Sequence, residues 1–134
     1  MKKMLTLLVS LMMSVGLCIS SSARAPNVVN PLWTNIASMS NSISFIGTEG
    51  HAYATVKGKT GTTAISATLT IYRQSGSDWI YVTSASDSTT NIRLSMGCDF
   101  AGIVGEYYKS VFEVAVTING IDELETKISF GNCT

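Results

Sequence analysis

Apolar and polar residues alternate with a period of two through most of the chain beyond residue 40, in short runs separated by Gly, Ser, Asn and Asp. Such alternation is typical of β-strands that bury one face, and no stretch beyond residue 23 keeps the spacing of an amphipathic helix. The pattern predicts seven strands, at Ser42–Ile46, Ala52–Val56, Ala64–Arg73, Asp78–Thr83, Asn91–Met96, Glu106–Ile118 and Glu123–Phe130.

Seven strands in about a hundred residues, with turns at regular spacing, are typical of an antiparallel β-sandwich of the immunoglobulin-like type. We therefore expect an all-β fold, with residues 41–134 as the sandwich and residues 24–40 as an extended N-terminal segment. A small closed barrel is the alternative.

The pairing of the third and fourth predicted strands follows from the turn between them. A turn centred on Ser75-Gly76 would place aliphatic side chains on one face and aromatic ones on the other, so both faces are consistent. The expected pairs are Ile71 with Ile80, Leu69 with Val82, Tyr72 with Trp79, and Thr70 with Tyr81.

In the last hairpin, the turn type that the residues favour and the turn length that avoids burying carboxylates are different. Asn119-Gly120 is a strong signal for a two-residue type I′ turn, but that turn would place Glu123 and Glu125 on the buried face. Burial of an unpaired carboxylate costs several kcal/mol. We therefore expect a three-residue turn over Asn119–Ile121, with the pairs Val116–Leu124, Val114–Thr126 and Phe112–Ile128.

The N-terminal segment has the features of a secretory signal peptide. Lys2 and Lys3 precede an apolar run over Leu5–Ile19, and small residues follow it. Because the run is too short to span a bilayer comfortably, we expect a secreted, extracellular protein with no stable membrane anchor after cleavage.

The cleavage point has two candidates. Cleavage after Ala23 gives a signal peptide of residues 1–23, whereas cleavage after Ala25 would leave Pro26 first, where proline is poorly accepted. The first is preferred. Lipidation of Cys18 is not expected, because Leu17 stands where a small residue is required.

Loss of the leader changes the charge of the chain. Nine basic and nine acidic residues balance in the full sequence, and removal of Lys2 and Lys3 leaves seven against nine. A weakly acidic chain lacks the basic stripe of nucleic-acid-binding proteins, so no nucleic-acid partner is expected.

Two cysteines, Cys98 and Cys133, remain in the exported part. Both lie at one end of the predicted sandwich, because the last strand runs antiparallel to Glu106–Ile118. An even pair in an oxidising compartment predicts a disulfide bond between them. Chain entropy would make that bond worth about 4 kcal/mol.

Four segments form a further pattern: Trp33-Thr34-Asn35-Ile36, Gly61–Leu69, Gly76-Ser77-Asp78-Trp79 and Gly105-Glu106-Tyr107-Tyr108. Together they resemble a family of small, secreted, uncharacterised Firmicutes proteins that carry a domain of unknown function. The resemblance implies an immunoglobulin-like sandwich and an exported location. It implies no activity, ligand or catalytic residue.

No residue set for catalysis or metal binding stands out in the sequence. His51 is the single histidine, and the G-x-S-x-G sequence of a serine nucleophile is missing. The carboxylates lie at or near turns without the spacing of a calcium loop. We therefore expect no enzyme activity, no cofactor and no metal.

The aromatic residues are the feature of the sequence that suggests a function. Tyr72, Trp79 and Tyr81 share the face opposite the aliphatic core residues, and flat aromatic arrays suit stacking on sugar rings or burial by a protein partner. The alternative is structural, with a Trp turned inward or the segment around Trp33 covering the rings. Tyr107 or Tyr108 is expected to lock a corner of the sandwich.

These observations predict a secreted, non-catalytic extracellular module that recognises a glycan or a protein. The alternative is a small secreted toxin or enzyme inhibitor that acts on a neighbouring cell. A hydrolase would need a concave polar pocket with His51 beside a carboxylate and a hydroxyl.

Overall fold

The computed structural model describes residues 32–134, which form seven β-strands and contain no helix that could cross a membrane. The predicted signal peptide lies outside the described residues. All seven predicted strands are present, and most are longer than the alternation indicated. The strands are β1 (Ile36–Ile46), β2 (Glu49–Gly58), β3 (Thr62–Ser75), β4 (Asp78–Thr89), β5 (Arg93–Ala101), β6 (Tyr107–Ile118) and β7 (Ile121–Asn132).

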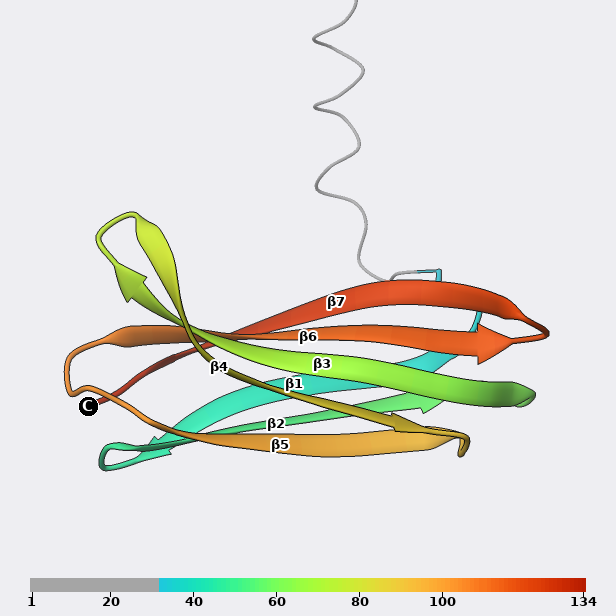
Figure 1. The fold of residues 1–134 in the computed structure, drawn as a ribbon, viewed down its shortest axis with the longest axis horizontal. Coiled ribbons are helices and arrows are strands. Elements are labelled where there is room, and N and C mark those ends of the chain that lie inside the picture. Colours follow the sequence, from blue (N-terminus) through green and yellow to red (C-terminus); the bar gives the residue numbers. More distant parts are fainter. Residues whose placement is uncertain (1–31) are drawn as a thin grey trace, which may run out of the picture. The chain divides into compact units, whose positions relative to one another are not determined.

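The strands form two antiparallel sheets (Figure 1), so the fold is a sandwich and not a closed barrel. One sheet has the order β1-β2-β5 and the other the order β4-β3-β6-β7. In antibody constant domains the fourth strand lies beside the fifth, whereas here it pairs with the third. This switch widens the second sheet and gives it a four-stranded outer surface.

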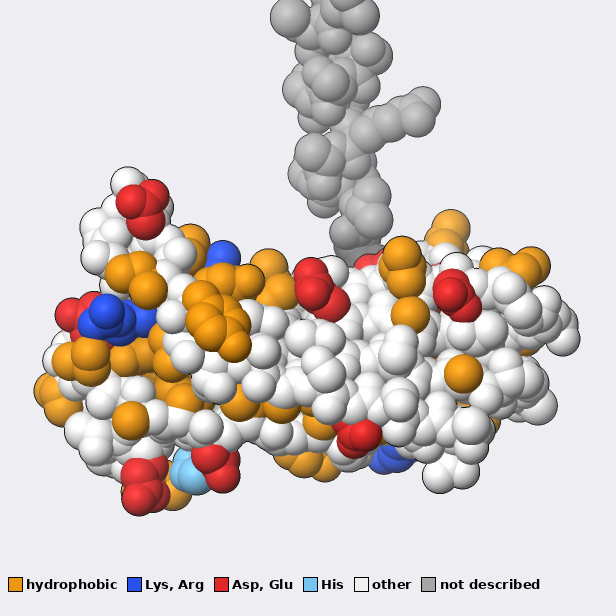
Figure 2. Space-filling model, viewed as in Figure 1, with side chains coloured by type: hydrophobic (Ala, Val, Ile, Leu, Met, Phe, Trp, Pro, Cys, Tyr) orange, Lys and Arg blue, Asp and Glu red, His pale blue; other side chains and the backbone are white. Residues whose placement is uncertain are grey.

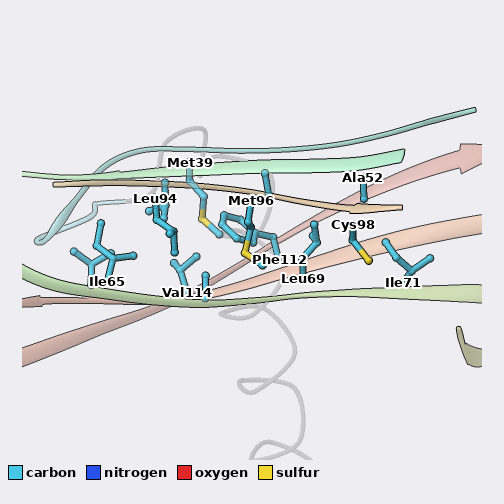
Figure 3. Close-up of a cluster of buried hydrophobic side chains, with 14 of the residues drawn as sticks. Met39, Ala52, Ile65, Leu69, Ile71, Leu94, Met96, Cys98, Phe112 and Val114 are labelled. Carbon is cyan, nitrogen blue, oxygen red and sulfur yellow. The ribbon is translucent and has the colours of Figure 1, made fainter. Parts of the chain in front are cut away.

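The core lies between the two sheets and follows from the period-two pattern. Alternate residues of β2, β3, β5 and β6 are buried, and the residues between them lie on the outer faces, where most are exposed or half-buried. Figure 3 shows side chains of both sheets pointing toward one another across this layer. The labelled residues are Met39, Ala52, Leu94, Met96 and Cys98 from the three-stranded sheet, and Ile65, Leu69, Ile71, Phe112 and Val114 from the four-stranded sheet.

Strand β1 begins earlier than the alternation predicted, at Ile36 and not at Ser42. The sandwich therefore includes part of the segment 24–40 that was expected to precede it. The reason is burial: Ile36 and Met39 are 1% and 7% exposed. A bulge between Ile36 and Ser38 breaks the period of two there, which hides this part of the strand in the sequence.

Tyr108 locks the loop between β5 and β6, as the sequence predicted for one of the two tyrosines. Its hydroxyl accepts a hydrogen bond of 2.8 Å from the backbone N–H of Ile103, five residues upstream. Its ring is 1% exposed and packs against Phe45 and Phe100, with centroid distances of 5.3 and 5.5 Å. This is the tyrosine corner of immunoglobulin-like folds.

The predicted register of the β3–β4 hairpin is wrong. The turn consists of Gly76 and Ser77, so that Gln74 pairs with Trp79 and Tyr72 pairs with Tyr81. Gly76 has a φ of +63°, which suits the first central position of a tight two-residue turn. A bulge follows between Ile71 and Tyr72, beyond which Ile71 pairs with Thr83.

The predicted three-residue turn of the last hairpin is also wrong. Asn119 and Gly120 form a two-residue turn with φ values of +53° and +74°, as type I′ requires. Val116 therefore pairs with Glu123, and Val114 with Glu125. The objection to this register was an unpaired buried carboxylate, but Glu123 is fully paired.

Glu123 binds the chain just before β1 and at its start. Its carboxylate accepts hydrogen bonds from the backbone N–H of Thr34 (2.7 Å), Asn35 (3.0 Å) and Ile36 (2.9 Å). The Thr34 hydroxyl adds a fourth bond of 2.6 Å. The register of β7 thus places a carboxylate where three free backbone donors need an acceptor.

The predicted Cys98–Cys133 disulfide is not formed in this structure: both thiols are free and buried. Strand β5 continues to Ala101, so Cys98 lies inside the strand and not at its end. Burial raises the pKa of the Cys98 thiol, and a hydrogen bond with Thr83 opposes that shift. Cys133 lies near the start of β6 as expected, but its thiol faces the Gly47 carbonyl at 3.5 Å.

A polar link joins β1 to the four-stranded sheet. The Asn41 amide donates to the backbone carbonyls of Ser110 and Lys127, both at 2.9 Å. Its oxygen accepts a hydrogen bond of 2.7 Å from the Ser110 hydroxyl, which is completely buried. One side chain therefore satisfies three polar groups at the sandwich edge.

Replacement of Asn41 by alanine is expected to lower the free energy of unfolding by about 1–2 kcal/mol, because the buried Ser110 hydroxyl loses its acceptor. Ser40→Ala, at the neighbouring exposed position, is the control and should change stability by less than about 0.5 kcal/mol. Urea unfolding measures both. Equal effects of the two substitutions would contradict the role of this link.

Candidate functional site

The outer surface of the four-stranded sheet carries the predicted aromatic residues. Tyr72, Trp79 and Tyr81 all lie on this surface, as expected, although their pairing differs from the prediction. Two further rings, Tyr107 of β6 and Phe130 of β7, join them. We call these five residues the aromatic platform.

The five rings of the platform form two groups, and the rings within each group are in contact with one another. Tyr107 and Phe130 are stacked, with centroids 5.7 Å apart and planes at 5°, and Trp79 lies 6.0 and 6.1 Å from them. Tyr72 and Tyr81 meet edge to face at 6.4 Å. These are the separations at which aromatic pairs attract one another, so each ring helps to fix its neighbours.

Lys109 lies between the two groups. Its Nζ is 4.5 Å from the centroid of the Trp79 ring and 5.2 Å from that of Tyr72. Both distances are in the range of cation–π attraction. The ammonium group therefore covers these two rings and adds a positive charge to the platform.

The rings differ in how much of each is accessible to a ligand. Tyr81 and Phe130 are 59% and 52% exposed, whereas Tyr72, Trp79 and Tyr107 are half-buried. The Trp33 segment, considered above as a cover, lies elsewhere: the Trp33 carbonyl accepts a hydrogen bond from Lys59, and its ring packs against the core. Tyr81 and Phe130 are thus the accessible surfaces of the platform.

A shallow trough of about 840 Å³ lies further along the same outer surface. Small hydroxyl residues of β3, β4 and β7 line it, together with Ala115 and Leu124. Three carboxylate residues, Asp87, Glu113 and Glu125, also line it, and it has no basic residue. The hydroxyl residues are Ser66, Thr68, Ser86, Ser88 and Thr126.

Figure 2 shows how side-chain types divide over one side of the molecule. Hydrophobic side chains gather at the end that carries the β3–β4 hairpin, with basic and acidic side chains among them. Fewer hydrophobic side chains are visible toward the opposite end in this view.

An aliphatic stripe on β7 borders both features. Leu124 and Ile128 are 73% and 47% exposed, and they alternate with Thr126 on the outward side of the strand. The inward side of β7 is polar instead, with Glu123, Glu125 and Lys127 facing β1 and β6. Polar residues that point inward are a common protection of edge strands against pairing with other chains.

His51 lies on the other sheet, away from the platform. Its Nδ1 is 2.7 Å from Asp99 Oδ1, and Ser44 is its cross-strand neighbour. A hydroxyl, an imidazole and a carboxylate therefore occupy one row across β1, β2 and β5. Within residues 32–134, however, no hydrogen bond joins Ser44 to His51, and the trough lies on the four-stranded sheet.

No cluster of three or more potential metal ligands is found within residues 32–134. The outer surface of the four-stranded sheet combines exposed rings, hydroxyls and carboxylates on paired strands. Sequence reasoning missed Tyr107, Phe130 and Lys109. The signal for Phe130 was Asn119-Gly120, whose two-residue turn points this ring outward; from the sequence alone that turn is rejected because it would bury Glu123 and Glu125.

The sequence matches no known protein family and no characterised protein. Among solved structures, it is similar to Spo0M, the sporulation control protein of Bacillus subtilis, with 13% identity over 75% of this chain and a TM-score of 0.41. The chain spans 50% of that protein. A likeness of this size carries no functional argument, and membership of the Firmicutes family described above stays a prediction.

Proposed function

We propose that this protein is an exported, non-catalytic recognition module that binds a glycan at or outside the cell surface through the aromatic platform. The observation that carries the proposal is the convergence of five aromatic rings on the solvent side of one sheet. The signal-peptide pattern of residues 1–23 supports export.

The platform suits a sugar because its accessible rings combine an apolar face with polar surroundings. Tyr81 presents its ring and a hydroxyl that already contacts Ser84 at 3.0 Å. The C–H face of a sugar ring can stack on such a surface while its hydroxyls remain hydrated or bind neighbouring polar groups. Isolated aromatic residues on a surface would not give this combination.

Rigidity also favours the platform as a binding surface. Trp79 packs against Tyr107 and Phe130 beneath the Lys109 ammonium group, and each of these residues belongs to a paired strand. Little rotational freedom is then lost when a ligand binds. Trp79 is accordingly a positioning residue, and Tyr81 and Phe130 are the residues that would contact the ligand.

The experiment compares the double substitution Tyr81→Ala and Phe130→Ala with Tyr53→Ala on a glycan array and by calorimetry. Tyr53 is a matched control, because it is 55% exposed on the outer surface of the opposite sheet. We expect the double variant to weaken glycan binding about tenfold or more, the size of one to two stacking contacts. Tyr53→Ala should leave binding unchanged. Equal binding by all three proteins would refute the platform as the site.

A second function has a specific observation in its favour. The aliphatic stripe of Leu124 and Ile128 lies beside the platform, and a protein partner would bury such side chains whereas a sugar would not need them. A secreted inhibitor or toxin would use this surface. Protease-inhibition and growth assays with Leu124→Ser and Ile128→Ser test it: both variants should abolish inhibition, whereas a protein that binds only a glycan shows no inhibition before or after the substitutions.

A further inference from the structure

We infer that the glycan is an extended chain of several sugar units without acidic groups, which lies along the strands from the aromatic platform into the hydroxyl trough. The inference rests on the proposed function and adds the length and charge of the ligand. It follows from the positions of the two features on one sheet and from the chemistry of the trough.

Cross-strand register places the two features on the same strands. Tyr81, Tyr72, Lys109 and Phe130 form one row across the sheet, and Ser86, Thr68, Glu113 and Thr126 form a parallel row in the trough. The rows are four residues apart on β3, β6 and β7, which is about 14 Å along a strand. One sugar ring cannot reach from the first row to the second, whereas a chain of several rings can.

The trough has the polar groups that sugar hydroxyls need. The hydroxyls of Thr68 and Ser86 lie 3.0 Å apart, and Ser66 and Ser88 form the next cross-strand pair. Each hydroxyl can donate one hydrogen bond and accept others, so the array suits a ligand that also presents hydroxyls. Small side chains such as Ala115 keep the floor low enough to admit a chain.

The charges of the trough set which chains it accepts. Of its acidic residues, Glu113 lies on the outward face between Thr68 and Thr126, whereas Asp87 and Glu125 border the trough from inward-facing rows, and no Lys or Arg lines it. A uronate, sulfate or phosphate group placed there would meet the negative charge of Glu113 without a counter-ion, which opposes binding. The Lys109 cation does not compensate, because it lies in the platform row, over Trp79 and Tyr72.

The experiment measures affinity against chain length. The probes are the disaccharide, tetrasaccharide and hexasaccharide of neutral series (cello-, chito-, xylo- and manno-oligosaccharides), with galacturonic-acid oligomers as the anionic series. We expect the best neutral hexasaccharide to bind about tenfold tighter than its disaccharide or better. The anionic oligomers should bind more weakly than neutral chains of equal length.

Two variants test the trough itself. Ala115→Phe fills the floor at an outward strand position that tolerates an aromatic ring. It should reduce the ratio of hexasaccharide affinity to disaccharide affinity to about twofold and leave the disaccharide affinity unchanged. Thr55→Phe on the opposite sheet is the control and should keep the wild-type ratio of hexasaccharide to disaccharide affinity.

Glu113→Lys tests the charge rule. It should reduce the ratio of neutral-chain affinity to anionic-chain affinity about threefold or more.

The outcomes separate this inference from the proposed function. If all lengths of a neutral series bind equally and Ala115→Phe changes nothing, the extended site is wrong while the platform still stands. If anionic chains bind as well as neutral ones, the charge rule is wrong. If only anionic chains bind, this inference is wrong while the glycan function still stands, and if no series binds at any length, both are wrong.

Discussion

Replacement of Glu123 by alanine is expected to lower the free energy of unfolding by about 2 kcal/mol, because four hydrogen-bond donors lose their acceptor at once. The donors are the backbone N–H groups of Thr34, Asn35 and Ile36 and the Thr34 hydroxyl. Two of the bonds are solvent-exposed, and water replaces them at little cost. The loss should therefore come mainly from Asn35 and Ile36. Chemical denaturation measures it.

The same contact makes stability depend on pH. Burial raises the pKa of the Glu123 carboxyl, but the hydrogen bonds from Thr34, Asn35 and Ile36 outweigh burial and hold the pKa below its ordinary value. A carboxyl whose pKa is lower in the folded state stabilises the fold above the unfolded pKa, about 4.3, and loses this effect as pH falls through the folded pKa. Stability should therefore decline from about pH 4.5 downward.

Two variants check this assignment. Glu123→Gln keeps an oxygen acceptor and removes the charge, so it should lose about 1 kcal/mol at neutral pH and show a flatter acid limb than the wild type. Glu125→Gln, one pair further along the same face of β7, is the control and should leave the acid limb unchanged. An unaltered acid limb in Glu123→Gln would show that this carboxyl does not cause the pH dependence.

The sequence predicted the strands better than their register. Period-two alternation depends on burial alone, and burial is regular along β2, β3, β5 and β6. Register depends also on turns and on distant partners. The acceptor role of Glu123 needs residues about ninety positions earlier in the chain, so a rule based on neighbouring residues treats the carboxylate as unpaired and selects the wrong turn.

The aromatic platform was predicted in part for the same reason. Tyr72, Trp79 and Tyr81 lie on adjacent strands, where an error of two residues leaves each side chain on the same face. Phe130 depends on the last hairpin, where the three-residue turn shifts the pairing by one residue and would have turned its ring inward. A register error of an odd number of residues therefore places a site residue on the wrong face of the sheet, whereas an error of an even number keeps it on the correct face.

The position of Cys98 was predicted wrongly because the sequence does not show where strand β5 ends. The alternation predicts that this strand ends at Met96, which leaves Cys98 in a loop at the end of the sandwich. The strand continues because Cys98 and Phe100 keep the inward positions, with Gly97 and Asp99 between them. Gly50 opposes Phe100 and leaves space for its ring, since a Cβ at this position would clash with the ring. No pattern within β5 alone shows this.

Tyr108 gives the largest expected change in stability, and its two functions can be separated. Tyr108→Ala removes a ring that is 1% exposed and contacts Phe45 and Phe100, and should cost about 4 kcal/mol. Tyr108→Phe keeps the ring and removes only the acceptor for the Ile103 N–H, and should cost about 1–2 kcal/mol. Urea unfolding measures both.

Tyr107→Phe is the matched control, because Tyr107 is the neighbouring residue on the opposite face of β6 and its ring stacks on Phe130. It should change stability by less than about 0.5 kcal/mol. Hydrogen exchange at Ile103 adds a local readout, since its amide should exchange faster in Tyr108→Phe while the amides of β3 and β6 stay protected. Unchanged exchange at Ile103 would mean that packing of the ring, and not the hydrogen bond, holds the β5–β6 loop closed.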